Sequence, residues 1–156
     1  MVRLFVGVLL LTCTQSFGQT TTTYETALGV KVSAGVAASF KKFITESNAL
    51  EFQTMFFNKG VRLIGLYEFH FYNIEGLDGL GWYFGPGAHV GFYYAKYKTV
   101  YNTIADIGID GVVGLDYRIK NTPINLSLDW QPSFGLLGKS GIQPQFGGLA
   151  IRYIVD

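Results

Sequence analysis

Apolar and polar residues alternate one by one from Ile107 to Phe134, the clearest pattern in the chain. Apolar residues or glycine occupy every second position over 107–119, and apolar residues do so again over 124–134, after a polar turn at 120–123. Successive side chains of a strand point to opposite faces, whereas neighbours on one helix face are three or four residues apart. The segment is therefore predicted to be a β-hairpin.

The two strands of this hairpin are unusually long. Strands of soluble proteins most often have about 5–6 residues, whereas a membrane-crossing strand needs roughly 9–11 tilted residues whose side chains face lipid and interior in turn. The hairpin meets that requirement. Soluble sandwiches and lipocalin-like barrels also have alternating strands, so the hairpin by itself leaves both architectures open.

The same alternation recurs along most of the chain. Further strands are predicted over 27–33, 36–44, 49–57, 61–72 and 82–95, and a last strand ends at Val155. Consecutive strands with short links pair as antiparallel hairpins, and an even number lets the sheet close with both termini at one end. The predicted fold class is therefore all-β, an eight-stranded antiparallel up-and-down transmembrane β-barrel.

Two places in this pattern are irregular. Pro86 cannot donate to a ladder of hydrogen bonds, so a bulge or weakened pairing is expected there. The segment 27–44 allows either two strands or one long bent strand, which would leave seven strands in all.

The N-terminus has the features of an export signal. Arg3 provides a positive start, residues 4–11 an apolar core, and Ser16 to Gly18 a cleavage site with small residues. Cleavage at Cys13 as a lipoprotein is the less favoured alternative. We expect a signal peptide at 1–18, a short polar leader at 19–26 and a barrel domain at 27–156, exported through the Sec pathway to the outer membrane.

Composition adds two limits. Without Arg3, the chain has equal numbers of basic and acidic residues, since the full sequence holds 12 and 11. No basic excess points to a nucleic-acid partner. The one cysteine lies in the expected signal peptide, so the exported protein would have no disulfide and would depend on closure of the sheet and burial for its stability.

The two faces of the strands differ in kind. Bulky rings fit poorly inside an eight-stranded barrel, whose interior holds only side chains, so the apolar face is expected outside. The aromatics expected to face lipid are Phe40, Tyr67, Phe69, Phe71, Phe84, Phe92, Tyr94, Tyr117, Trp130, Phe134 and Tyr153. The expected lumen charge network is Lys31, Lys41, Glu51, Arg62, Glu68, His70, His89, Asp110, Asp116, Arg118, Asp129 and Arg152.

Four segments carry a resemblance to a known family: Gly65–His70, Trp82–Phe92, Ile107–Tyr117 and Asn125–Trp130. They resemble the small outer-membrane β-barrel proteins common in Bacteroidetes, which are similar in size to the OmpA and OmpX barrels. The resemblance implies the fold and the location, with outer-membrane lipid and the barrel insertion machinery as partners of a monomer. The chain departs from the family where it lacks an aromatic residue at its C-terminus.

Candidate catalytic groups are explained more simply as structural ones. His70 and His89 are expected inside the barrel, and three aspartates with Arg118 are expected to form salt bridges rather than an acid–base pair. The glycines of 85–91 follow strand spacing and precede no helix, unlike a phosphate-binding loop. We expect no catalytic residue, cofactor or metal, and a plugged barrel with a structural or surface-interaction role. The alternatives are a narrow channel for small solutes and a lipid A-modifying enzyme.

Overall fold

The computed structural model describes residues 24–97 and 104–156, so the expected signal peptide and most of the expected leader lie outside the described residues. The strands are β1 (Thr26–Val32), β2 (Val36–Phe43), β3 (Asn48–Phe57), β4 (Gly60–Phe71), β5 (Leu80–Tyr93), β6 (Ala105–Arg118), β7 (Ile124–Trp130), β8 (Ser133–Leu137), β9 (Gly141–Gln143) and β10 (Gly147–Ile154). A single turn of 3-10 helix, η1, spans Ala95–Tyr97. No helix within the described ranges is long and apolar enough to cross a membrane.

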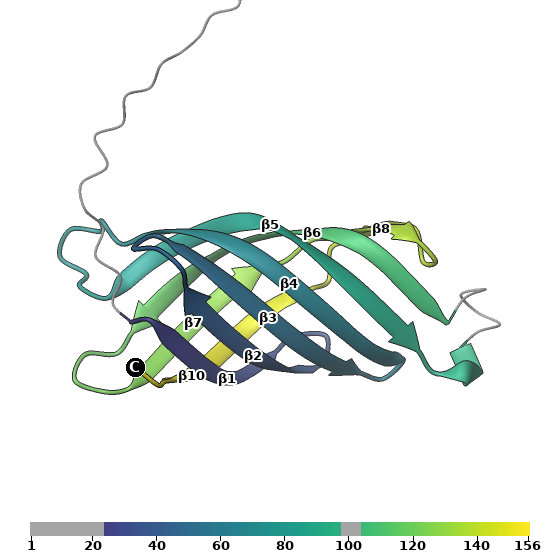
Figure 1. The fold of residues 1–156 in the computed structure, drawn as a ribbon, viewed down its shortest axis with the longest axis horizontal. Helices are drawn as coiled ribbons and strands as arrows, with labels where there is room; N and C mark the ends of the chain where they lie inside the picture. Colours follow the sequence, from purple (N-terminus) through teal and green to yellow (C-terminus); the bar gives the residue numbers. More distant parts are fainter. Residues whose placement is uncertain (1–23, 98–103) are drawn as a thin grey trace, which may run out of the picture.

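Eight of these strands close into a barrel (Figure 1). Each strand from β1 to β6 pairs antiparallel with the next one along the chain, so that β6 pairs with β7. β7 pairs with β10, and β10 pairs with β1, which closes the barrel. Each barrel strand thus has a partner on both sides, which removes the open edges of the sheet. The prediction of an all-β, closed, eight-stranded antiparallel barrel is confirmed.

The first two strands are separate. β1 pairs with β2 from Thr26 opposite Lys42 to Val32 opposite Val36, around a tight turn at 33–35. The pairing is also weakened near Pro86, as predicted. The β4–β5 ladder runs to Leu66 opposite Gly87 and resumes only at Phe69 opposite Phe84, without a change of register.

The seventh strand differs from the prediction of one continuous strand to Phe134. It stops at Trp130, and β8 begins at Ser133 after two residues outside the ladder. The β6 side stays connected because the Gly111 amide donates to the Pro132 carbonyl at 2.9 Å. Pro132 has no amide proton, so the reciprocal bond to the Gly111 carbonyl is missing from this ladder. Beyond it, β8 pairs instead with the short strand β9, which the sequence pattern did not predict.

The barrel has two distinct ends (Figure 1). The terminal end holds residues 24–25 and 155–156 and the turns 44–47, 72–79 and 119–123. Backbone amides of Glu25 and Thr26 donate to the Asp156 carboxylate at 2.8 and 2.7 Å, which ties the two described ends of the chain together. The loop end holds the turns 33–35, 58–59 and 138–140, together with η1.

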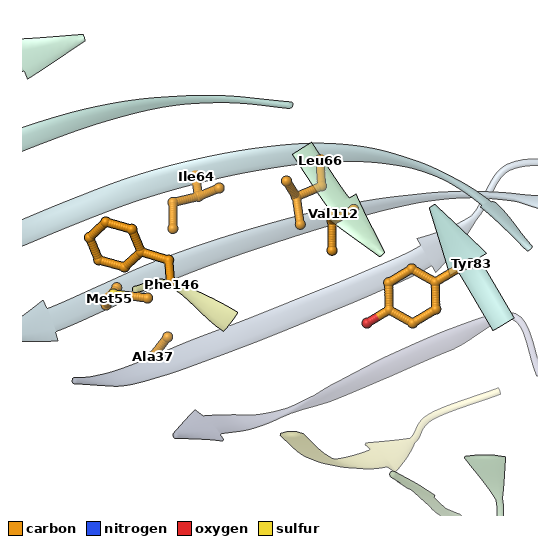
Figure 2. Packing of buried hydrophobic residues seen from close by; sticks show 7 residues of the cluster. All are labelled: Ala37, Met55, Ile64, Leu66, Tyr83, Val112 and Phe146. Atoms are coloured by element: carbon orange, nitrogen blue, oxygen red, sulfur yellow. The ribbon is translucent and has the colours of Figure 1, made fainter. Parts of the chain in front are cut away.

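Part of the barrel interior is apolar. Figure 2 shows seven buried residues that pack there: Ala37, Met55, Ile64, Leu66, Tyr83, Val112 and Phe146. Six of them belong to barrel strands, whereas Phe146 lies between β9 and β10. The remaining interior is strongly polar and forms the candidate site.

Candidate functional site

The charged side chains expected inside the barrel are buried there, with one exception. Eleven of the twelve are among the buried residues, and Lys31, Lys41, Glu51, Glu68, Asp116 and Arg152 have no exposed surface at all. Arg118 is only half-buried, because it is the last residue of β6 and lies at the terminal end. Alternation along a strand predicts whether a side chain points into the barrel or out of it. Its burial also depends on its position along the barrel axis, since side chains near either end are closer to solvent.

Nearest the terminal end, the interior holds a dense ionic network around Lys41 and Arg152. Arg152 Nη2 lies 2.7 Å from Glu51 Oε1, and Lys41 Nζ lies 2.8 Å from Glu68 Oε2 and 3.3 Å from Glu51 Oε2. Arg152 also donates through Nε to the Ser39 hydroxyl at 2.7 Å and through Nη1 to Ser127 at 2.7 Å. The guanidinium therefore bridges opposite walls, since Ser39, Glu51 and Ser127 come from β2, β3 and β7.

Tyr24 closes this network at the terminal end, although its position falls in the predicted polar leader. The side chain is 3% exposed, and its hydroxyl donates to Asp116 at 3.1 Å. Its ring meets Phe43 edge-on at 5.1 Å between centroids. The leader prediction is therefore wrong at this residue. Because Tyr24 precedes the first alternating strand, no periodic pattern in the sequence indicates that its side chain is buried.

Lys31 and Asp129 form a second interior pair. Lys31 Nζ lies 2.7 Å from both carboxylate oxygens of Asp129, and the Tyr83 hydroxyl donates to Asp129 at 2.7 Å. Both charged side chains are fully buried. An isolated buried charge costs several kcal/mol, so pairing is what makes these positions tolerable.

Nearest the loop end, Arg62 and His89 share the carboxylate of Asp106. Arg62 Nη2 lies 3.2 Å from Asp106 Oδ2, and His89 Nε2 lies 3.3 Å from the same oxygen. His89 Nδ1 is 2.9 Å from Asp110. Asp106 was not predicted as a site residue, because it was assigned to the connection before the sixth strand, whereas β6 begins at Ala105.

The buried charges are not balanced by lysine and arginine alone. Among the described residues, the buried carboxylates outnumber the buried Lys and Arg side chains by two: Glu51, Glu68, Asp106, Asp110, Asp116 and Asp129 against Lys31, Lys41, Arg62 and Arg152. Each buried histidine lies against a carboxylate, His70 at 2.8 Å from Glu68 and His89 between Asp106 and Asp110.

Two further ion pairs at the terminal end lie in solvent and differ sharply from the interior ones. Lys42 lies 3.9 Å from Glu25, and Lys120 lies 2.9 Å from Asp78, with all four side chains at least half exposed. The hydrogen bond to Asp78 raises the pKa of Lys120. Exposed pairs of this kind contribute little to stability.

The outer wall carries the aromatics expected on the apolar face. Phe84, Phe92, Tyr94, Tyr117, Trp130, Phe134 and Tyr153 are exposed by 37–56%, and Phe40, Tyr67, Phe69 and Phe71 are half-buried on the same face. Phe52, Phe56 and Trp82, which were not predicted among them, are also exposed there. Phe71 stacks on Trp82 at 4.6 Å between ring centroids, which joins neighbouring strands across the outside of the wall.

The described residues contain no cluster of three or more His, Cys, Asp or Glu side chains arranged to hold a metal ion. The geometry thus defines a class: an all-β protein whose closed eight-stranded barrel has a charged, ion-paired interior and an apolar exterior. Comparisons of the chain with protein-family models, curated proteins and solved structures found no match.

Proposed function

We propose that the protein is an integral outer-membrane β-barrel with an interior plugged by its own side chains, and that it acts without catalysis in a structural or surface-interaction role. One observation carries the proposal. Large apolar side chains cover the outside of the barrel, while most charged side chains of its strands, all except Lys42 and Arg118, are buried within. This is the reverse of the arrangement in a soluble barrel.

The exposed apolar surface is spread over the whole barrel wall. Strands β1, β5, β6 and β10 each have at least three large apolar side chains exposed. The other four barrel strands contribute Val36, Phe52, Phe56, Leu63, Leu128 and Trp130. Soluble monomers rarely expose a contiguous apolar patch larger than a few hundred Å². Lipid tails, which need no hydrogen bonds, would cover such a wall without cost.

The plug is supported by the size of the interior side chains. Arg62, Arg152, Tyr83, Lys31 and Lys41 are each less than 2% exposed. The ion pairs and hydrogen bonds described above fix these side chains in the interior. The interior of an eight-stranded barrel has room only for side chains. A continuous water-filled path would require several of these ion pairs to separate.

The export signal expected at 1–18 and the resemblance of the strand segments to small Bacteroidetes barrels support the outer membrane as the location. With both termini on the periplasmic side, the terminal end faces the periplasm and the loop end faces outward.

Fractionation of the tagged protein tests the location. We expect it in the outer-membrane fraction, and we expect the unboiled protein to migrate differently from the boiled protein on a denaturing gel. Recovery from the soluble periplasmic fraction after export would contradict the proposal.

Two measurements test the role. Purified protein in a planar bilayer is expected to give no stepwise current, and regular conductance steps would identify a channel instead. The acyl pattern of lipid A is expected to be the same with and without expression, and an altered pattern would identify an enzyme.

A further inference from the structure

A groove of about 370 Å³ lies on the outer wall, beside the turn that precedes β5. Its floor includes Leu115 on β6, Leu128 on β7 and Leu149 on β10, which stand opposite one another in the ladders of these three strands. Leu77 from the turn and Leu80 at the start of β5 line the groove as well. Its volume falls within the range of about 300–1,000 Å³ that is usual for small-molecule pockets.

The turn that carries Leu77 is fixed by backbone hydrogen bonds. The Leu80 amide donates to the Leu77 carbonyl at 3.1 Å, and the Arg118 amide donates to the Gly79 carbonyl at 2.9 Å. Gly79 has a φ of 85°, which favours glycine, and a Cβ there would lie only 2.7 Å from the Arg118 carbonyl oxygen. The turn is therefore held against β6, and the groove is a fixed feature of the wall.

An ion pair lies at the terminal end of the groove. Asp78 follows Leu77 in the sequence, and its carboxylate lies 2.9 Å from the Lys120 ammonium. The two side chains are 83% and 63% exposed. Because an ammonium has three donors and a carboxylate has several acceptor positions, both groups can bind a further partner without separating from each other.

The groove and the ion pair together match the chemistry of a phospholipid. The leucines of the floor belong to the exposed outer wall, and an acyl chain can lie against them because it needs no hydrogen bonds. In the proposed orientation, the headgroups of the periplasmic leaflet lie at the terminal end, where Lys120 and Asp78 are found. A phosphate accepts from the Lys120 ammonium, and an ammonium donates to the Asp78 carboxylate.

We propose that this groove binds one acyl chain of a phosphatidylethanolamine molecule from the periplasmic leaflet, with the lipid phosphate beside Lys120 and the lipid ammonium beside Asp78. The inference rests on the proposed membrane location. It adds to that location a site on one side of the wall that selects one class of lipid by its headgroup.

The test is native mass spectrometry of the folded full-length protein in a non-ionic detergent. The protein would be titrated with dioleoyl forms of phosphatidylethanolamine, phosphatidylglycerol and diacylglycerol, which differ only in their headgroups. We expect one phosphatidylethanolamine to bind at least fivefold more tightly than either of the others, because phosphatidylglycerol lacks the ammonium and diacylglycerol lacks both charges. Equal affinities for the three lipids, or no bound phosphatidylethanolamine, would overturn the proposal.

A first pair of variants tests the groove. Leu128→Trp fills its floor and is expected to weaken phosphatidylethanolamine binding at least tenfold. Leu63→Trp provides the matched control, since Leu63 is 44% exposed on the outer face of β4 and does not line the groove. The control is expected to change the affinity less than twofold, and equal losses in the two variants would place the lipid elsewhere on the wall.

A second pair tests the headgroup contacts. The double change Asp78→Asn and Lys120→Gln is expected to abolish the preference for phosphatidylethanolamine over diacylglycerol. The double change Glu25→Gln and Lys42→Gln removes the other exposed ion pair of the terminal end, which does not adjoin the groove, and is expected to retain the preference. Retention of the preference in both double variants would overturn the assigned headgroup contacts.

The outcome can be separated from the test of location. A protein that is found in the outer-membrane fraction but binds no phosphatidylethanolamine would overturn this inference alone. Recovery of the protein from the soluble fraction would contradict the proposed function and this inference together.

Discussion

An arginine at the middle of the outer wall tests whether lipid covers it. Ile151 lies in the middle of β10, is 54% exposed, and pairs with Val30 on one side and Leu126 on the other. The change Ile151→Arg would place a charge among apolar side chains on three adjacent strands. Such a charge at the middle of a bilayer costs about 2–4 kcal/mol, whereas a substitution on a water-covered surface usually changes stability by less than about 0.5 kcal/mol.

A second arginine provides the matched control. Leu137 is the last residue of β8 at the loop end and is 64% exposed, so it would lie close to the membrane surface, where the same charge costs roughly 0–1 kcal/mol. Both variants would be refolded into lipid vesicles, and the free energy of unfolding would be measured by denaturant titration of tryptophan fluorescence. Equal free energies for the two variants, both within about 0.5 kcal/mol of wild type, would refute the assignment of this face to lipid.

Two further predictions concern the barrel itself. Gly85→Ala is expected to destabilise the barrel by about 1–3 kcal/mol, because the new Cβ would overlap the Tyr67 carbonyl. Gly65→Ala is the control, since its Cβ would meet only the Phe52 ring at 3.8 Å. The control should leave the midpoint of unfolding nearly unchanged. Glu51→Gln is expected to cost about 3–5 kcal/mol, because it leaves two buried cations short of a partner. The exposed Glu25→Gln should shift stability by less than about 0.5 kcal/mol, and similar losses in both glutamate variants would contradict the buried network.

Side-chain alternation was sufficient to predict the barrel and most of its interior. On β4, for example, Arg62, Glu68 and His70 are buried while Leu63 is exposed, as the period of two requires. Pairing partners across the interior were not predictable in the same way. Arg152 meets Ser39 across 113 residues of sequence, and such contacts depend on the tilt and stagger of the closed sheet.

The residues that sequence analysis missed lie where the alternation begins or breaks. Tyr24 precedes the first alternating strand, and Asp106 is the second residue of β6, before the predicted start of that strand at Ile107. Phe146 lies between two strands and follows neither pattern. In each case the side chain is buried by tertiary packing, for which a periodic pattern provides no signal.

The end of β7 accounts for the burial of Phe146. The ladder between β7 and β10 ends at Trp130 opposite Gly147, and the segment 133–146 leaves the barrel wall. Instead β8 and β9 form a separate hairpin, and the Gln131 amide donates to the Phe146 carbonyl at 2.9 Å, which turns this ring into the barrel. Phe146 then lies under Arg62, whose guanidinium carbon is 4.1 Å from the ring centroid. The departure of the chain from β10 beyond Gln131 thus places an aromatic ring inside the barrel from a segment that has no strand periodicity.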